Sequence, residues 1–149
     1  MHYITYQNTY KNGTKYILTE ATIYYNGKNM RTVALWDTGA TQTHITEDVI
    51  NAFDCEIIGE DESYCHTGIA SFTKHKIDIG LPSGCIIKDV YVASTANIPY
   101  KKYDIGLLIG MDIIRLGNFH FDCINNKMLF SFTHQYDGDE DKLIKTKLF

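Results

Sequence analysis

The sequence predicts one domain built mostly of β-strands. Its 149 residues are enough for a domain with its own hydrophobic core. Tyrosine, isoleucine, threonine and valine are abundant, and the whole chain has only two prolines. These residue types favour strands, and no long stretch shows the 3.6-residue apolar period of an amphipathic helix. We therefore expect a mostly-β fold with short helices.

A β-hairpin is predicted first, where two runs of strand-forming residues flank Asn26-Gly27. Both positions of such a two-residue turn need a positive φ, which asparagine and glycine tolerate best. The second strand of this hairpin leads directly to Asp37. Residues 46–53 then predict a short helix, with Thr46 as its N-cap and acidic residues in its first turn.

The second half of the chain returns to strands. Its predicted units are a long hairpin at 63–81 with Gly68 near its tip, a strand at 85–94, a short buried strand at 103–110, a brief helix at 111–116 with Gly117 at its C′ position, and a hairpin at 119–132 that turns at Asn125-Asn126.

We expect the domain to span residues 17–134, between an N-terminal segment at 1–16 and a charged C-terminal tail at 135–149. The tail mixes an acidic cluster with a basic, apolar end, which is typical of a solvated or loosely docked segment.

Composition and charge exclude several classes of function. A formal net charge of −4 provides no basic field, so nucleic acid is not an expected partner. No signal peptide and no apolar run of about 20 residues is visible, which favours a cytoplasmic protein without a membrane partner. The four cysteines show no CxxC pairing and are expected to be reduced thiols, with two disulfides as the alternative. They are Cys55, Cys65, Cys85 and Cys123.

Asp37-Thr38-Gly39 is the motif most closely tied to chemistry. It follows the apolar residues 33–36 and continues into Ala40. A carboxylate at the end of a buried strand is costly to place, so Asp37 either belongs to an ordinary turn or carries out chemistry. A second motif, LLIGMDII at residues 107–114, begins 70 residues after Asp37. It combines apolar residues, a glycine, an aspartate and a short helix.

Together the two motifs resemble those of the retroviral-type (retropepsin-like) aspartic proteases, over residues 17–132. The final helix and hairpin are more similar to cellular and bacterial members than to the shortest viral ones. The resemblance implies a closed β-barrel with one or two short helices. It also implies an aspartic endopeptidase that uses neither a cofactor nor a metal.

This mechanism needs two carboxylates that share one proton, because two like charges so close together cannot both ionise. The chain has one Asp-Thr-Gly, since Asp78-Ile79-Gly80 and Asp104-Ile105-Gly106 lack the hydroxyl. The expected partner is therefore a second copy of the chain, in a two-fold symmetric homodimer that contributes Asp37 twice.

The resemblance also implies roles for single residues. Thr38 would form a hydrogen bond across the dimer axis, and Gly39 would let the substrate backbone come close. The implied substrate-binding residues are Leu35, Ala40, Thr41, Gly68, Ile69, Ala70 and Leu108, of which the two leucines favour apolar side chains. Gly110 and Asp112 belong to the second, structural motif, and Gly110 would let its strand pack beneath the catalytic loop.

The hairpin around residues 66–73 is expected to be a flap that closes on an extended peptide, which would bind as an added strand. The flap has one glycine at its presumed tip, so Ile69 or Tyr64 would cover the substrate. Viral enzymes typically carry an acid and an arginine where this chain has Thr41 and Met111. Both charges are missing together, so neither is left buried without its partner.

Several alternatives remain open. The chain could be a non-catalytic retropepsin-fold module for dimerisation or peptide binding, or a generic β-barrel binding protein in which Asp37-Thr38-Gly39 is a coincidental turn sequence. A zinc site formed by Cys65, His66, His75 and Cys85 does not match any compact finger spacing. Trp36 and Tyr64 are interpreted as packing residues, and His44 as a structural or exposed histidine. The hairpin at 119–132 is our candidate dimer interface, because its apolar alternation needs a partner sheet.

Overall fold

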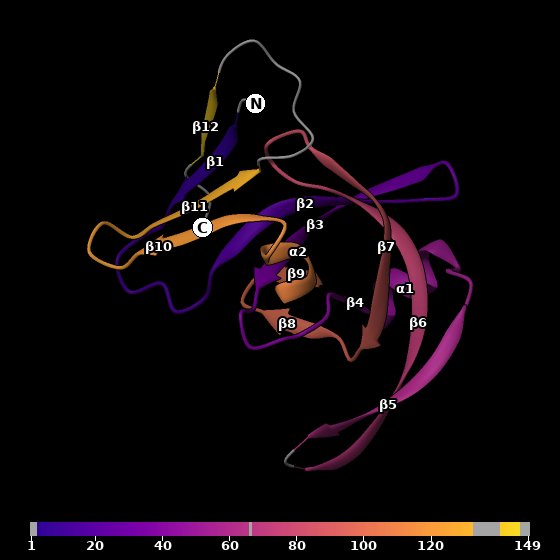
Figure 1. Ribbon diagram of the computed structural model, residues 1–149. Helices are drawn as coiled ribbons and strands as arrows, with labels where there is room; N and C mark the ends of the chain where they lie inside the picture. Colours follow the sequence, from indigo (N-terminus) through magenta and orange to yellow (C-terminus); the bar gives the residue numbers. More distant parts are fainter. Residues whose placement is uncertain (1–2, 66, 133–140, 147–149) are drawn as a thin grey trace.

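A computed structural model describes residues 3–65, 67–132 and 141–146. Strands dominate these ranges, and both helices within them are short, which confirms the mostly-β prediction (Figure 1). The elements are β1 (Ile4–Thr9), β2 (Leu18–Tyr25), β3 (Lys28–Trp36), β4 (His44–Thr46), α1 (Glu47–Phe53), β5 (Gly59–Cys65), β6 (Gly68–Gly80), β7 (Ile86–Thr95), β8 (Ile98–Tyr100), β9 (Tyr103–Ile109), α2 (Met111–Ile114), β10 (Gly117–Asp122), β11 (Lys127–Phe132) and β12 (Lys142–Thr146).

The larger sheet has the strand order β2-β3-β9-β4-β7-β6-β5, with β8 beside β9. β6 also pairs with β2, so the path of pairings returns to its first strand. β3 runs parallel to β9 and β4 runs parallel to β7, whereas the other pairs are antiparallel. Alternate side chains of these strands point into a core that includes Ala34, Ile45, Val92, Leu107 and Ile109, each with no exposed surface.

The turn between β2 and β3 forms where the sequence predicts it. Asn26 has a φ of 49° and Gly27 a φ of 74°, as a two-residue hairpin turn of this type requires. Since β3 is the strand that leads to Asp37, this local signal fixes the direction from which the chain enters the candidate site.

Each helix follows a strand, α1 after β4 and α2 after β9. Thr46 precedes α1 with extended backbone, as expected of an N-cap, although its side chain makes no capping hydrogen bond. The prediction for Gly117 was wrong, because α2 ends at Ile114 and Gly117 is the first residue of β10. A Cβ at Gly117 would collide with the carbonyl oxygen of Ser131 on β11, so close strand packing explains this glycine.

The hairpin of β5 and β6 extends well away from the rest of the larger sheet (Figure 1). Residues 68–73 of β6 pair only with β5, whereas β6 also pairs with β7 from Lys74 onward. Gly68 begins β6 with a φ of 124°, close to the expected tip. His66, the first residue of the expected flap, lies outside the described residues.

A second sheet has the order β10-β11-β1-β12. Both terminal segments therefore contribute strands, because residues 4–8 pair with residues 142–146 in parallel. Apolar side chains of the 119–132 hairpin face the chain's own core, where Phe119 stacks on Trp36 and Phe130 meets Trp36 in an edge arrangement. Part of the apolar alternation of this hairpin is therefore satisfied within the chain, and the hairpin as a dimer interface stays a prediction. Within the described residues, no helix is long and apolar enough to cross a membrane.

Candidate active site

Asp37 occupies the first position after β3, in a tight turn. Its N–H donates to the carbonyl oxygen of Ile109 on β9 at 2.9 Å, and its own carbonyl oxygen accepts from Ala40 N–H at 3.2 Å. The Oδ1 atom of Asp37 accepts from Gly39 N–H at 2.9 Å. Asp37 is half-buried, whereas Thr38 and Gly39 are exposed. The turn therefore holds the carboxylate at the surface in a defined orientation.

Gly110 lies against the Asp-Thr-Gly turn. A Cβ at Gly110 would lie 2.5 Å from the carbonyl oxygen of Gln42 and 3.0 Å from that of Ala40. Both obstructing atoms belong to the backbone, so they cannot move aside as a flexible side chain can. The N–H of Met111 donates to Ala40 at 2.8 Å, which joins the start of α2 to the same turn.

Asp112 and Thr43 form a second connection beneath the turn. The Asp112 carboxylate accepts from Thr43 N–H at 3.0 Å and from the Thr43 hydroxyl at 2.7 Å. The Thr43 hydroxyl in turn accepts from Gly110 N–H at 3.1 Å. Thr43 is fully buried and was not among the predicted site residues. No sequence signal at position 43 could have found it, because the link joins residues 69 positions apart.

Leu35 and Leu108 lie side by side near Asp37. The two residues are directly opposite in the parallel pair of β3 and β9, so they share one face of the sheet. Both are half-buried, whereas their neighbours Trp36 and Ile109 are buried on the opposite, core face. The two leucines therefore form an apolar surface outside the core, close to the residue that follows β3.

The remaining predicted substrate-binding residues are divided between two places. Ala40 and Thr41 belong to the Asp37 turn, whereas Gly68, Ile69 and Ala70 are exposed on the projecting hairpin. Tyr64 lies directly opposite Ile69, and their exposed fractions are 86% and 59%. The interpretation of Tyr64 as a packing residue was therefore wrong, while that of Trp36 is confirmed by its exposed fraction of 4%.

A cavity lies away from the Asp37 turn. It has a volume of about 900 Å³, and its walls come from β3, α1, β8 and β9. Asp104 and Gly106, from the second Asp-x-Gly sequence, are among its lining residues. Asp37 does not line this cavity, so a search for a binding site by cavity alone would not select the Asp37 turn.

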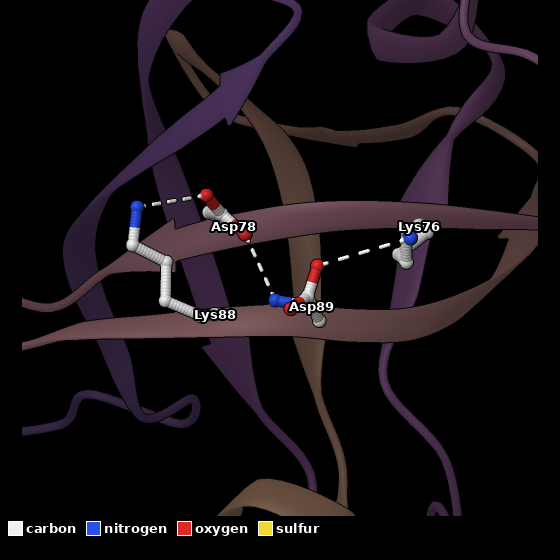
Figure 2. A network of polar contacts seen from close by, with 4 residues as sticks. All are labelled: Lys76, Asp78, Lys88 and Asp89. Carbon is white, nitrogen blue, oxygen red and sulfur yellow. Dashed lines mark hydrogen bonds and ion pairs between the residues drawn. The ribbon is translucent and has the colours of Figure 1, made fainter.

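The third Asp-x-Gly sequence, at Asp78, stabilises a β-bulge (Figure 2). Asp89 has a φ of 54°, and its N–H donates to Asp78 Oδ1 at 2.8 Å. Lys88 Nζ lies 3.1 Å from Asp78 Oδ2, and Lys76 Nζ lies 3.9 Å from Asp89 Oδ1. Partial burial acts to raise the pKa of Asp78, but these hydrogen bonds and lysines lower it below its usual value. Asp78 is therefore a structural carboxylate.

Among the residues of the zinc alternative, His75 has both ring nitrogens engaged in other hydrogen bonds. His75 is fully buried, and its two ring nitrogens form hydrogen bonds with the Thr73 hydroxyl and the Glu56 carbonyl oxygen. Cys55, Cys85 and Cys123 are free thiols, and burial raises the pKa of Cys55. His66 lies outside the described residues.

No protein-family model and no curated protein matches the sequence. Solved structures do match the fold. A retropepsin-like aspartic protease from Rickettsia conorii superposes with a TM-score of 0.57 and 12% identity, over 88% of this chain and 93% of that chain. EIAV protease in complex with an inhibitor gives 0.49 and 19%, over 70% and 90%. The retroviral protease-like domain of Ddi1 from Leishmania major gives 0.44 and 14%, over 80% and 96%. This chain has a retropepsin-like fold.

Proposed function

We propose that the chain is one subunit of an aspartic endopeptidase. Two copies of Asp37, one from each subunit of a homodimer, would activate the water that attacks a peptide bond. The observation that carries the proposal is the half-buried Asp37 carboxylate, fixed by Gly39 N–H in an exposed turn that is fastened to Gly110. The retropepsin-like fold supports it.

The chemistry explains why two copies are needed. One carboxylate must be ionised to take a proton from water, while the other must hold a proton for the substrate carbonyl oxygen. A pair of carboxylates in close contact meets both needs by sharing a single proton. Each chain supplies one Asp-Thr-Gly, and its exposed Thr38 is available for a contact across a two-fold axis.

The surroundings of Asp37 suit an extended peptide. Leu35 and Leu108 offer an apolar surface for a substrate side chain. We assign the projecting β5–β6 hairpin as the flap, in which Tyr64 and Ile69 would exchange water contact for substrate contact. The ring of paired strands, from β2 to β6 and back to β2, would act as a closed barrel that keeps these parts in position.

Cleavage of a mixed peptide library, read by mass spectrometry, tests the proposal. We expect Asp37→Asn to lower cleavage by about 10²–10⁴-fold because it removes the ionisable pair. Asp104→Asn is the matched control, since Asp104 is an exposed aspartate in another Asp-x-Gly sequence and should leave cleavage unchanged. Sedimentation of each protein gives its oligomeric state.

Two outcomes would contradict the proposal. Equal cleavage by wild type and Asp37→Asn would show that the Asp37 carboxylate has no role in catalysis. A protein that is active as a monomer at all concentrations would rule out an active site shared between two subunits. A dimer that binds peptides but cleaves none would instead favour the alternative, a non-catalytic module for dimerisation or peptide binding.

A further inference from the structure

The cavity lined by β3, α1, β8 and β9 borders a free strand edge. β3 pairs with β2 from Lys28 to Leu35, but it pairs with β9 only from Val33 onward. Residues 103–105, at the start of β9, pair with β8 on the other side of that strand. Among the described residues, the first half of β3 therefore has no strand partner on the side of β9. Such an edge offers N–H and C=O groups to an added strand.

The backbone groups of Arg31 point toward this free side of β3. Trp36 N–H donates to Ile17, directly before β2, whereas Asp37 N–H donates to Ile109 on β9. Successive residues of a strand direct their N–H and C=O groups to alternate sides, and the pairing of β3 with β2 is regular throughout. Arg31 is an even number of residues from Asp37, so its N–H and C=O face the cavity that it lines.

The cavity has the size and the lining that suit a short stretch of extended chain. Its volume is about 900 Å³, and its lining includes Met30 from β3 and Val49 and Ala52 from α1. Gly106 N–H donates to the Thr32 hydroxyl at 3.1 Å, where β9 approaches β3. This contact closes the end of the cavity at which the two strands come together. The apolar lining would receive side chains that an added strand directs to one face.

The charges of the lining leave one carboxylate unbalanced. Arg31 forms an ion pair with Glu20 at 3.3 Å. Lys102 and Asp104 lie on the same hairpin and carry opposite charges. The remaining charged residue is Asp48, in the first turn of α1, and no cation of the lining is left to balance it. The cavity is therefore complementary in charge to a segment that carries a lysine or an arginine.

We propose that this cavity is a docking groove for an extended, basic segment of another protein. The segment would pair with the free edge of β3, place apolar side chains at alternate positions against the lining, and bring a lysine or an arginine to Asp48. Asp37 does not line the groove, so the inference does not depend on the proposed function. The partner would be recognised apart from the candidate active site.

Binding of labelled peptides to the full chain tests the inference, with Asp37→Asn in every protein so that the probe is not cleaved. The probe is a fluorescein-labelled peptide in which valine alternates with lysine, and fluorescence anisotropy measures its Kd. The same peptide with glutamate in place of lysine should bind more weakly, by at least about threefold at low salt. Hydrogen exchange should slow at the Arg31 amide when the probe is bound, because its N–H becomes paired.

Modified probes and one pair of variants test the two kinds of contact separately. N-methylation of the peptide residues whose N–H groups face β3 should weaken binding by at least about tenfold, whereas N-methylation of the alternate residues should have little effect. Asp48→Asn should weaken binding by about two- to fivefold. Glu47→Gln, which removes the neighbouring carboxylate of α1 outside this groove, is the matched control and should leave the Kd unchanged.

Three results would overturn the inference. They are a probe that does not bind, equal binding of the two sets of N-methylated peptides, and slowed exchange at the Asp37 turn or the β5–β6 hairpin with none at Arg31. None of them bears on peptide cleavage by wild type, so the protease proposal stands or fails by its own test.

Discussion

Replacement of Thr43 by valine tests whether the Thr43 hydroxyl holds the Asp37 turn to the start of α2. Valine has nearly the same shape as threonine, so the change removes the hydroxyl and little else. Two hydrogen bonds disappear: the donation to the Asp112 carboxylate at 2.7 Å and the acceptance from Gly110 N–H at 3.1 Å. The Gly110 amide is buried and would lose its partner.

The expected magnitude follows from these two losses. A hydrogen bond to a charged group contributes about 1.5–3 kcal/mol, and a buried donor left unpaired costs about 1–3 kcal/mol. Asp112 is half-buried, so water can replace part of its loss. We therefore expect Thr43→Val to lower the free energy of unfolding by about 2–4 kcal/mol. Thr43→Ser keeps the hydroxyl and removes one methyl group, which costs about 1 kcal/mol.

Urea denaturation at one fixed protein concentration measures both variants, because subunit association would otherwise shift the apparent stability. The difference between the variants isolates the hydroxyl and should be about 2 kcal/mol, or about 4–8 °C in Tm for a chain of this size. Thr43→Val with a stability equal to or above that of Thr43→Ser would refute the reasoning. In that case the contacts of Asp112 would be incidental to the fold.

Two further predictions concern a glycine and a bulge. Gly110→Ala should destabilise the chain by about 1–3 kcal/mol and lower peptidase activity, because the new methyl group would collide with the Gln42 backbone. Gly59→Ala is the control and should be close to neutral, because its nearest contact is Lys74 Cδ at 3.5 Å. Equal losses of stability in the two variants would contradict a collision at Gly110. Asp78→Asn should lower the free energy of unfolding more at pH 6 than at pH 3, because the pKa of Asp78 is lowered in the folded state. The stability that the Asp78 carboxylate contributes is present above its unfolded-state pKa of about 3.9, and it is lost as the pH falls through its folded-state pKa. A stability difference that stays constant between these two pH values in urea titrations would contradict this.

The parts of the fold that the sequence predicts are those encoded over short distances. The turn at Asn26-Gly27 needs two positive φ values, and this requirement is visible in the dipeptide itself. The apolar run before Asp37 predicts a buried strand in the same local way. Residues 142–146 form β12 through pairing with residues 4–8, more than 130 positions away. From the sequence, the lysines of this segment indicate a solvated tail. The structure explains them differently: β12 is an edge strand with three exposed residues, Lys142, Leu143 and Lys145.

The candidate site shows the same division. Asp37 and Gly110 can be recognised in the sequence because each position requires one residue type: a carboxylate at 37 and a residue without a Cβ at 110. Thr43 carries no such local signal, and its place follows only from a contact between residues 69 positions apart. Gly117 was misread for a related reason. A glycine soon after a helix is commonly its C′ residue, but here a contact with a strand 14 residues later requires it.

Among the described residues, the Asp37 turn is held by hydrogen bonds between backbone groups and by the carboxylates of Asp37 and Asp112, rather than by an ion pair. Ile109 and Met111 bind the turn through their backbones, and Asp112 binds Thr43 beneath it. None of the ion pairs that join described residues involves the turn or α2: they join Arg31 with Glu20, Lys74 with Asp61, Lys76 with Asp89 and Lys88 with Asp78. Exposed ion pairs weaken as salt screens them, whereas backbone hydrogen bonds of this kind do not. Salt dependence of peptide cleavage would therefore reflect subunit association or substrate charge, and not a loosening of the turn that carries Asp37.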